Sequence, residues 1–401
     1  WSPGTYLNTT AGATVTSSPL ANITYTITGT DANGCQNTAI ANVTVSGNAP
    51  INAGPDVTIC NGDNTTLTAT GGISYTWDQT LGNGNNFVVS PTVNTTYTVI
   101  GIDANGCSGT DLMVVTISPL PTATIGMDAT VCLGDVAPTI TFTGANGTAP
   151  YTFTYNINGG ANTAVTSVGT NAAVSAPTGA AGTFVYNLVS VSDNSATSCS
   201  QAQVGIATII VNPLPTATIG TDVTLCQGDF APTITFTGAN GTAPYTFTYN
   251  INGGANSTVI SVGNTATVTA PTGAIGTFNY NLVSVEDSGT NCSQAQAGTA
   301  SVIVNPLPTA TIGVDATVCI GAASPIITFT GANGTAPYTF TYNINGGANI
   351  TVTALANVFA APVTTVVAGT YVFNLVSVSD ASVSSCSQAQ VGTATVIITP
   401  G

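Results

Sequence analysis

The chain has 401 residues without a single Lys, Arg or His, and its 15 acidic residues give a formal net charge of −15. A chain without cations cannot neutralise phosphates, so this composition excludes nucleic-acid binding and attraction to anionic membrane surfaces. It also excludes catalysis by a histidine base or a lysine nucleophile, and we expect no enzyme activity.

Hydrophobic residues make up 43% of the chain and follow regular patterns. Disordered chains are poor in such residues, so we expect a folded protein. No apolar run reaches the length of a membrane-spanning helix, and we therefore expect no direct membrane insertion. The chain starts at Trp1 without a signal peptide or an initiator methionine, which indicates a segment of a longer protein.

Internal repeats of two types organise the chain. In the shorter type, GPDVTICNGD at Gly54–Asp63 leads to TTYTVIGIDANGC at Thr95–Cys107, and the closing half recurs at Ile23–Cys35. The longer type starts with PLPTATIG at Pro119, Pro213 and Pro306. We therefore predict five domains, called here the first to fifth repeats: the C-terminal part of a truncated domain at residues 1–48, then 49–118, 119–212, 213–305 and 306–401.

Within each repeat, hydrophobic residues alternate with threonines. In YTFTYN, Tyr151, Phe153 and Tyr155 share one face, and in TFVYNLVSV the alternation becomes ambiguous at Val189 and Val191, which indicates a β-bulge. Such alternation, broken by NG, GG and AP turn signals, is typical of half-buried antiparallel strands. We predict an all-β chain with one immunoglobulin-like β-sandwich per domain.

The segment TGANGTAPYTFTYNINGGAN occurs unchanged at Thr143–Asn162, Thr237–Asn256 and Thr330–Asn349. We interpret it as two core strands joined by a loop. Trp77 is interpreted as a core tryptophan in preference to a sugar-stacking residue. Proline fixes φ and favours stiff extended backbone in the NPLP and SPLP linkers, so we expect an elongated array of tandem domains.

Nine cysteines lie at matched positions, one leading cysteine early in a repeat and one trailing cysteine before its last strand. Pairing by repeat position predicts the disulfides Cys60–Cys107, Cys132–Cys199, Cys226–Cys292 and Cys319–Cys386. Cys35 is a trailing cysteine, and we expect its partner to lie upstream of Trp1. The absence of histidine and of CxxC pairs favours disulfides over zinc, and disulfides indicate a location outside the cytoplasm.

Most acidic residues recur at three places: four residues before the leading cysteine, three after it, and in the turn before the trailing cysteine. The simpler interpretation is that these residues form turns by bonding to their own backbone. The alternative is calcium, because a disulfide within each repeat would gather acids at one pole of the domain. The candidate calcium ligands are Asp135, Asp193, Asp229 and Asp287, and no other cofactor is predicted.

These motifs resemble known repeat families. The first two repeats, with GPDVTICNGD, SYTWD and TTYTVIGIDANGC, resemble the PKD-like, Ig-type modules of very long Bacteroidetes surface proteins. The three longer repeats, with PLPTATIG, TGANGTAPYTFTYNINGG and CSQAQ, resemble the repeats of giant gliding-motility adhesins of the flavobacterial type. The resemblance covers essentially the whole chain. It implies type IX secretion, attachment at the outer membrane, and a filament served by cell-surface motility or secretion machinery.

The leading functional interpretation is structural. The chain would form disulfide-stapled stalk or spacer repeats of a long secreted cell-surface adhesin, for gliding motility or surface adhesion, with neighbouring repeats as its main partners. One alternative is a module that recognises extracellular polysaccharide or a protein, and another is a self-associating filament subunit. Identity among the copies favours the spacer, because binding does not require identical core strands.

Overall fold

The computed structural model describes residues 1–401 as strands joined by turns and loops. It contains no helix, so no helix of membrane-spanning length is present. Contacts divide the chain into two compact units: unit 1 comprises Trp1–Asp128, Thr139–Ala176 and Phe184–Thr208, and unit 2 comprises Ala129–Pro138, Pro177–Thr183 and Ile209–Gly401. The third repeat contributes to both units, and the division into five domains stays a prediction.

Unit 1 begins with the first two repeats. In the first repeat, β1 (Ile23–Thr30) and β2 (Gln36–Val43) form an antiparallel pair. The second repeat has a five-stranded sheet in the order β3-β9-β8-β5-β6 and a two-stranded sheet of β4 and β7. Its strands are β3 Val57–Cys60, β4 Thr65–Thr68, β5 Ser74–Trp77, β6 Gly82–Asn83, β7 Asn86–Val89, β8 Thr95–Ile102 and β9 Ser108–Ser118.

The third repeat supplies strands to both units. In unit 1, β10, β12 and β15 form a three-stranded sheet, and β13 pairs with β14 and β16. In unit 2, β11 pairs in parallel with the last residues of β17. The strands are β10 Thr122–Gly126, β11 Ala129–Cys132, β12 Thr139–Ala145, β13 Thr152–Ile157, β14 Thr163–Thr166, β15 Asn171–Ser175, β16 Gly182–Ser192 and β17 Ser200–Asn212.

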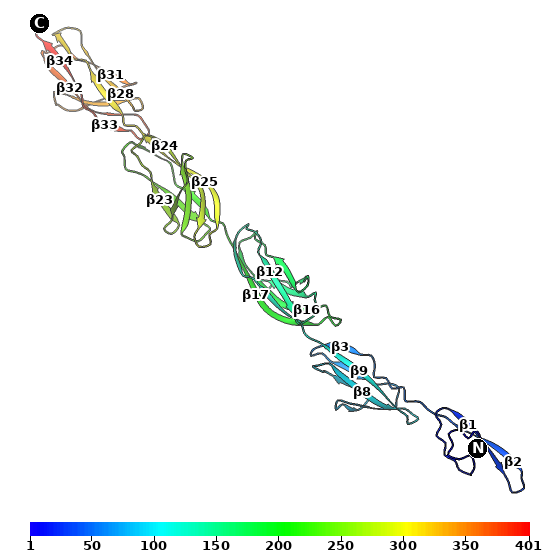
Figure 1. Cartoon of the computed structure of the whole chain (residues 1–401). Coiled ribbons are helices and arrows are strands. Elements are labelled where there is room, and N and C mark those ends of the chain that lie inside the picture. Colours follow the sequence, from blue (N-terminus) through cyan, green and yellow to red (C-terminus); the bar gives the residue numbers. More distant parts are fainter. The chain divides into compact units, whose positions relative to one another are not determined.

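The fourth repeat lies wholly in unit 2 and shows an immunoglobulin-type sandwich (Figure 1). One sheet has the order β18-β20-β23 and the other β19-β25-β24-β21-β22. Within this repeat, the chain passes from one sheet to the other between β18 and β19, since β18 pairs with β20 whereas β19 pairs in parallel with β25. The strands are β18 Thr216–Ile219, β19 Val223–Cys226, β20 Thr233–Ala239, β21 Tyr245–Ile251, β22 Ser257–Ile260, β23 Thr265–Thr269, β24 Gly276–Asp287 and β25 Ser293–Asn305.

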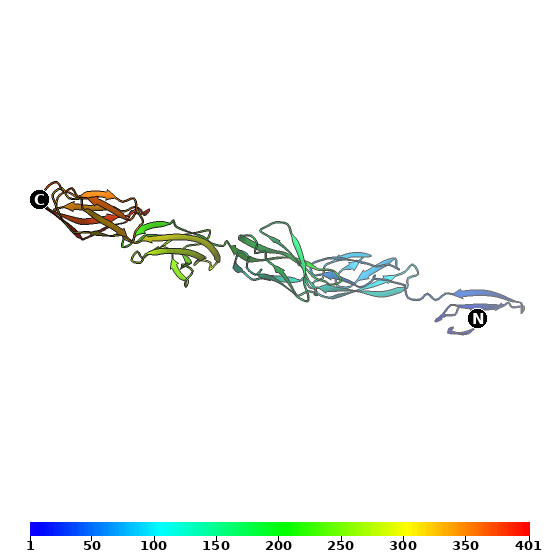
Figure 2. The ribbon, with the colours of Figure 1, turned by 90° about the horizontal axis from the view of Figure 1, so that it is seen from above.

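The fifth repeat follows the same order, with sheets β26-β28-β31 and β27-β34-β32-β29-β30. In Figure 2 it is the orange to red part of the ribbon that ends at the C-terminus. Its last strand is interrupted, and the short β33 pairs with β32 beside β34. The strands are β26 Thr309–Gly313, β27 Ala316–Cys319, β28 Ile326–Ala332, β29 Thr339–Ile344, β30 Ile350–Thr353, β31 Val358–Pro362, β32 Gly369–Ser379, β33 Ser387–Ala389 and β34 Thr393–Thr399.

In the fourth repeat, the hydrophobic residues that alternate with threonines in the sequence are the ones whose side chains are buried. Phe236 of β20 is buried, and so are Tyr245, Phe247 and Tyr249 on one face of β21. The ring centroids of Phe236 and Phe247 are 5.6 Å apart and connect the two sheets. Removing each such side chain from water contributes about 1.5–3 kcal/mol to stability. The prediction that these aromatic residues form the core is confirmed.

The second repeat has its own core around Trp77. The Trp77 side chain is 3% exposed and belongs to a cluster with Leu67, Val99 and Val115. A side chain buried to this degree cannot stack on an external sugar. The structure confirms that Trp77 is a core residue.

The predicted β-bulge is present in β16. The register against β13 shifts between Thr154 and Tyr155, and Val189 is left without a partner position. The extra residue changes the phase of the alternation, so Leu188 and Val191 are both buried. The ambiguity in the sequence pattern therefore marks a real irregularity of the strand.

Close packing around the second strand of the shared segment requires two of its glycines. A Cβ atom on Gly238 would lie 2.6 Å from a ring carbon of Tyr245. A Cβ atom on Gly241 would lie 2.5 Å from the carboxylate oxygen Oδ2 of Asp287. Any side chain at either position would displace the ring or the aspartate. The loop of the shared segment is thus fitted to the loop that precedes the trailing cysteine.

Loss of the hydroxyl group at two tyrosines of the third repeat should change the free energy of unfolding in opposite directions. Tyr186 is 0% exposed and its hydroxyl has no hydrogen-bond partner, whereas the Tyr151 hydroxyl donates to the carbonyl of Gly147 at 2.8 Å. The fifth repeat carries Phe373 at the position of Tyr186. We expect Tyr186→Phe to raise the free energy of unfolding by about 1 kcal/mol and Tyr151→Phe to lower it by about 1–2 kcal/mol.

Denaturant titration of the two variants measures this difference. Equal destabilisation by both substitutions would contradict the assignment of Tyr186 as an unsatisfied polar group.

Candidate functional site: the cysteine junctions

Three disulfides join consecutive repeats. In each, a leading cysteine bonds to the trailing cysteine of the following repeat, and the Cα atoms are 5.5 to 5.6 Å apart, inside the usual range. The bonds connect the second repeat to the third, the third to the fourth and the fourth to the fifth: Cys60–Cys199, Cys132–Cys292 and Cys226–Cys386.

The predicted pairing within each repeat is wrong. None of the bonds Cys60–Cys107, Cys132–Cys199, Cys226–Cys292 and Cys319–Cys386 is formed. Cys107 and Cys319, which were expected to be bonded, are free thiols together with Cys35.

The parallel pairing of β19 with β25 explains the error. Cys226 ends β19 and lies opposite Asn305, the last residue of β25, whereas Cys292 directly precedes the first residue of β25. β25 has 13 residues, which at about 3.3 Å per residue span roughly 40 Å. A disulfide needs Cα atoms within about 7 Å. The two cysteines of one repeat therefore lie at opposite ends of its last strand, and each can only bond outside its own repeat.

Each bonded leading cysteine lies in a turn closed by hydrogen bonds. In the fourth repeat, the N–H of Cys226 donates to the carboxylate of Asp229 at 2.8 Å, and the N–H of Asp229 donates to the carbonyl of Cys226 at 3.1 Å. The same two bonds join Cys132 and Asp135, at 2.8 and 3.0 Å. Asp135 and Asp229 are turn residues, as the simpler interpretation predicts.

Each trailing cysteine closes a loop that begins at an aspartate. In the third repeat, the N–H of Asp193 donates to the carbonyl of Cys199 at 3.0 Å. The buried carboxylate of Asp193 accepts hydrogen bonds from the N–H of Thr148 at 2.9 Å and from the hydroxyl of Ser195 at 2.7 Å. The first of these bonds, from aspartate N–H to cysteine carbonyl, recurs at 2.9 to 3.0 Å in Asp31–Cys35, Asp103–Cys107, Asp287–Cys292 and Asp380–Cys386.

Asp193 makes the stability of the fold depend on pH. Burial raises its pKa, but hydrogen bonds from the Ser195 hydroxyl and from backbone N–H groups, including that of Thr148, outweigh burial and lower the pKa from its ordinary value of 3.8. Because the pKa is lowered in the folded state, ionised Asp193 stabilises the fold above about pH 3.8, and this contribution is lost as the pH falls through the lowered pKa.

We expect Asp193→Asn to lower the free energy of unfolding at pH 7 by about 1–3 kcal/mol, because the amide nitrogen that replaces one carboxylate oxygen cannot accept a hydrogen bond. The difference between the variant and the unmodified chain should shrink as the pH falls through the lowered pKa of Asp193, because the native carboxylate then becomes protonated. Thermal denaturation between pH 2 and 7 measures both effects. The exposed Glu286 offers a control, and Glu286→Gln should change the stability by less than about 0.5 kcal/mol. A destabilisation by Asp193→Asn that does not vary with pH would contradict this role of the charge.

Polar contacts accompany the disulfide between the fourth and fifth repeats. The side-chain amide of Asn305 donates to the hydroxyl of Ser384 at 2.9 Å, and the sulfur of Cys226 lies 3.9 Å from the carbonyl oxygen of Ser384. A hollow of about 420 Å³ beside them is lined by linker residues, including Pro306, and by Gln388 of the fifth repeat. The linker and the disulfide thus meet at one junction.

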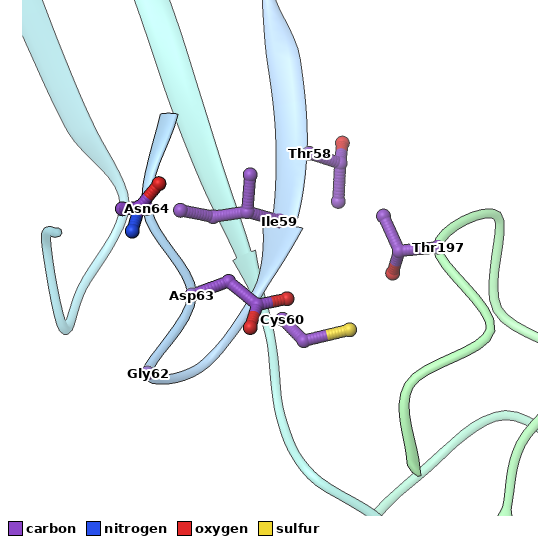
Figure 3. Close-up of a pocket in the computed structure, with 7 residues that line it drawn as sticks. All are labelled: Thr58, Ile59, Cys60, Gly62, Asp63, Asn64 and Thr197. Atoms are coloured by element: carbon purple, nitrogen blue, oxygen red, sulfur yellow. The ribbon is translucent and has the colours of Figure 1, made fainter. Parts of the chain in front are cut away.

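Figure 3 shows the corresponding place at Cys60. Thr197, from the trailing loop of the third repeat, faces Thr58 and Cys60 of the second repeat. These residues line a surface hollow of about 400 Å³ together with Asp63. Asp63 is the one titratable side chain in this lining besides the bonded cysteine, so the hollow offers no pair of groups for acid–base chemistry.

The calcium candidates are all engaged in local hydrogen bonds. Asp135 and Asp229 bond to the turns of their leading cysteines, and Asp193 and Asp287 bond to the loops of their trailing cysteines. Their predicted gathering depended on disulfides within each repeat, which do not form. No group of three or more His, Cys, Asp and Glu side chains is arranged to hold a metal ion. Calcium binding stays a prediction without a preformed set of ligands.

No protein-family model matches the chain, and no curated protein matches it. Three solved structures illustrate what it is similar to. A structure concerned with host cell surface retention of a 1.5-MDa bacterial ice-binding adhesin shares 17% identity over 70% of this chain and 98% of that one, with a TM-score of 0.36. An I-band fragment of titin shares 14% identity over 70% of this chain and 98% of that one, with a TM-score of 0.42.

The third structure is a tetra-tandem repeat from the extending region of a large adhesion protein. It shares 13% identity over 85% of this chain and 98% of that one, with a TM-score of 0.29. TM-scores this low support no statement about function.

Proposed function

We propose that the chain is a structural stalk or spacer segment of a long secreted cell-surface adhesin. The observation that supports this proposal is the series of disulfides between consecutive repeats. Each disulfide bridges a proline-containing linker, so the neighbouring repeats are joined by two covalent connections. Repeats joined twice stay together when one connection is broken, which suits a protein that transmits load.

The overlap of the disulfides adds to this property. The shortest covalent route along the chain runs to Cys60, crosses to Cys199, continues to Cys226 and crosses to Cys386. It bypasses sequence separations of 139 and 160 residues. Even when every repeat unfolds, the distance between the two chain ends can therefore reach only a small part of the length of a fully extended chain without disulfides.

The disulfides and the sequence resemblance support the proposed location and wider role. Disulfides form and persist in oxidising environments outside the cytoplasm, which supports an extracellular protein. The resemblance to flavobacterial gliding adhesins supports the finer proposals, which are a Bacteroidetes origin, type IX secretion and attachment at the outer membrane. In that setting the spacer serves gliding motility or surface adhesion, with the motility or secretion machinery as its partner.

Recognition of a polysaccharide is the second candidate function. Phe230 favours it, because this ring is fully exposed in the loop after the turn of Cys226. Tyr6 is the one other aromatic residue among the large exposed hydrophobic side chains. A single exposed ring in a repeat provides little stacking surface for a sugar, and we rank the spacer higher.

Incubation of the full chain on an array of polysaccharides distinguishes the two functions. The spacer proposal predicts no saturable binding. Saturable binding that is lost in Phe230→Ala would replace the spacer by a recognition module.

A further inference from the structure

The loop between the aspartate and the trailing cysteine, called here the trailing loop, differs in length among the three junctions. The third and fifth repeats have five residues in this loop, Asn194–Ser198 and Ala381–Ser385. The fourth repeat has only four, Ser288–Asn291. The middle disulfide, Cys132–Cys292, is therefore formed by a trailing loop that is one residue shorter than the other two.

One hydroxyl group in each trailing loop bonds to the aspartate. Ser195 and Ser382 each donate to the carboxylate of the aspartate two residues earlier, at 2.7 Å. In the fourth repeat, Thr290 donates to the carboxylate of Asp287. The same three hydroxyl groups accept a hydrogen bond from the N–H of their trailing cysteine at 3.4 Å, so they have the same role.

The two longer loops hold a second hydroxyl group beside the disulfide. Thr197 and Ser384 stand two residues before the trailing cysteine and donate to its sulfur at 3.1 and 3.3 Å. Figure 3 shows Thr197 facing Cys60, the leading cysteine of that junction. Ser384 also accepts a hydrogen bond from the amide of Asn305, which lies opposite Cys226 at the end of β25. These two residues therefore cover their disulfides from the side of the trailing loop.

The shorter loop leaves the middle disulfide without this cover. Thr290 also stands two residues before its cysteine, but its hydroxyl is bonded to the aspartate, and no hydroxyl group bonds to the sulfur of Cys292. Asn212 lies opposite Cys132, the position that Asn305 has at the next junction. The side-chain nitrogen of Asn212 is buried without a hydrogen-bond partner. One hydroxyl group thus replaces two, and the contact to the strand end is lost.

The leading cysteine of the middle disulfide is also the most accessible of the six bonded cysteines. Cys132 is half-buried, whereas Cys60 and Cys226 are 8% and 7% exposed. The three trailing cysteines are 0–1% exposed. A thiolate breaks a disulfide by attacking one sulfur directly, so the rate of reduction depends on access to that sulfur.

We propose that the middle disulfide is a redox-sensitive joint, which small thiols reduce while the other two disulfides stay intact. Its reduction leaves the linker as the one covalent connection between the third and fourth repeats. The shortest covalent route along the chain does not use this bond and is unchanged. This inference goes beyond the spacer function, because it rests on the length of the trailing loops and their contacts.

The reductant is a small-molecule dithiol. One of its thiolates attacks the sulfur of Cys132, the S–S bond breaks, and Cys292 leaves as a thiolate that takes up a proton. The second thiol of the reductant then attacks the mixed disulfide, releases the Cys132 thiol and closes a cyclic disulfide. One protein disulfide and one dithiol thus become two protein thiols and one small disulfide, so atoms and electrons balance.

The test uses the full chain with its three disulfides intact and its free thiols blocked by iodoacetamide. Dithiothreitol is added, and samples are quenched with N-ethylmaleimide at increasing times. Digestion with pepsin and mass spectrometry then give the rate for each disulfide, because the chain offers no Lys or Arg to trypsin. Cys132 and Cys292 should be labelled about tenfold faster or more than the other bonded cysteines. Equal rates at the three disulfides, or faster reduction of either covered one, would overturn the proposal.

Exchange of the trailing loops shows whether the loop is the cause. Replacement of Ser288–Asn291 by ASVSS, the loop of the fifth repeat, should slow reduction of the middle disulfide about fivefold or more. Replacement of Ala381–Ser385 by SGTN should accelerate reduction of Cys226–Cys386 to a similar degree, and Ser384→Ala should change it in the same direction. Cys60–Cys199 in the same molecules is the control, and its rate should not change.

The single substitution also separates cover from chemical assistance. A hydroxyl group that donates to the trailing sulfur could speed reduction by stabilising the departing thiolate. Slower reduction of Cys226–Cys386 in Ser384→Ala would show that the hydroxyl group acts in this way and would contradict the proposal.

Discussion

Removal of the disulfide between the second and third repeats should lengthen the fully stretched chain by roughly 400 Å. Removal of the disulfide between the third and fourth repeats should not lengthen it at all. The first variant is Cys60→Ser/Cys199→Ser and the second is Cys132→Ser/Cys292→Ser, so that neither leaves an unmatched new thiol.

The difference follows from the overlap of the disulfides. The shortest covalent route uses the Cys60–Cys199 and Cys226–Cys386 bonds and does not use the bond between Cys132 and Cys292. Without Cys60–Cys199, the route must run to Cys132 and return from Cys292 to Cys226, which adds roughly 110 residues at about 3.5 Å each. Loss of the middle disulfide leaves the original route unchanged.

Single-molecule stretching of the chain, held at its two ends and with free thiols blocked, measures the total length of each variant. Disulfides confined to single repeats would make both variants longer than the unmodified chain. Lengthening of the middle-disulfide variant would therefore contradict the observed pairing.

Phe247→Ala should lower the free energy of unfolding of the fourth repeat by about 3–5 kcal/mol. Phe247 is 0% exposed, and its ring lies 5.6 Å from that of Phe236 and 6.2 Å from that of Tyr245. Its removal leaves a cavity between the two sheets that these rings cannot fill. A domain is typically stable by only about 5–15 kcal/mol, so the fourth repeat should become marginally stable.

Native-state hydrogen exchange is the suitable measurement, because a chain of several repeats does not unfold in one step. Amides of β21 and β24 should exchange at least a hundredfold faster in the variant. Phe230→Ala in the same repeat is the matched control, and its fully exposed ring predicts a change below about 0.5 kcal/mol. Similar effects of the two substitutions would show that Phe247 is not a core residue.

The features that depend on neighbouring residues could be predicted from the sequence. Alternation with period two identified the strands, and it placed Phe153 and Tyr155 in the core. The same pattern located the bulge near Val189, because an extra residue reverses the phase of the alternation. Asp31 and Asp103 also form the expected turns, since their bonds reach only two to four residues along the chain.

The disulfide pairing could not be predicted in this way. Alternation shows which face of a strand is buried, but it does not show which strand lies beside it. Placement of Cys226 depends on the parallel pairing of β19 with β25, whose residues are about eighty positions apart. One signal was available: the two short strands TATI and VTLC are separated by Gly220, Thr221 and Asp222, and such a break indicates a change of sheet rather than one continuous strand.

Long-range contacts of the aspartates were missed for the same reason. The carboxylate of Asp222, four residues before Cys226, accepts a hydrogen bond from the N–H of Ser301 at 2.8 Å. Asp128 and Asp315 make the same bond to the last strand of their repeats, at 2.7 Å. These aspartates hold the start of the second strand against the last one, a role that no local motif reveals.

Cleavage of a single linker tests most directly whether disulfides join consecutive repeats. A recognition sequence for a site-specific protease is inserted between Pro213 and Pro215, and the cut chain is examined by electrophoresis without reductant. We predict that the two fragments migrate as one species near 39.6 kDa, held by Cys132–Cys292, and that they separate on reduction or in Cys132→Ser/Cys292→Ser. Separation of the fragments from the otherwise unmodified chain without reductant would contradict the account.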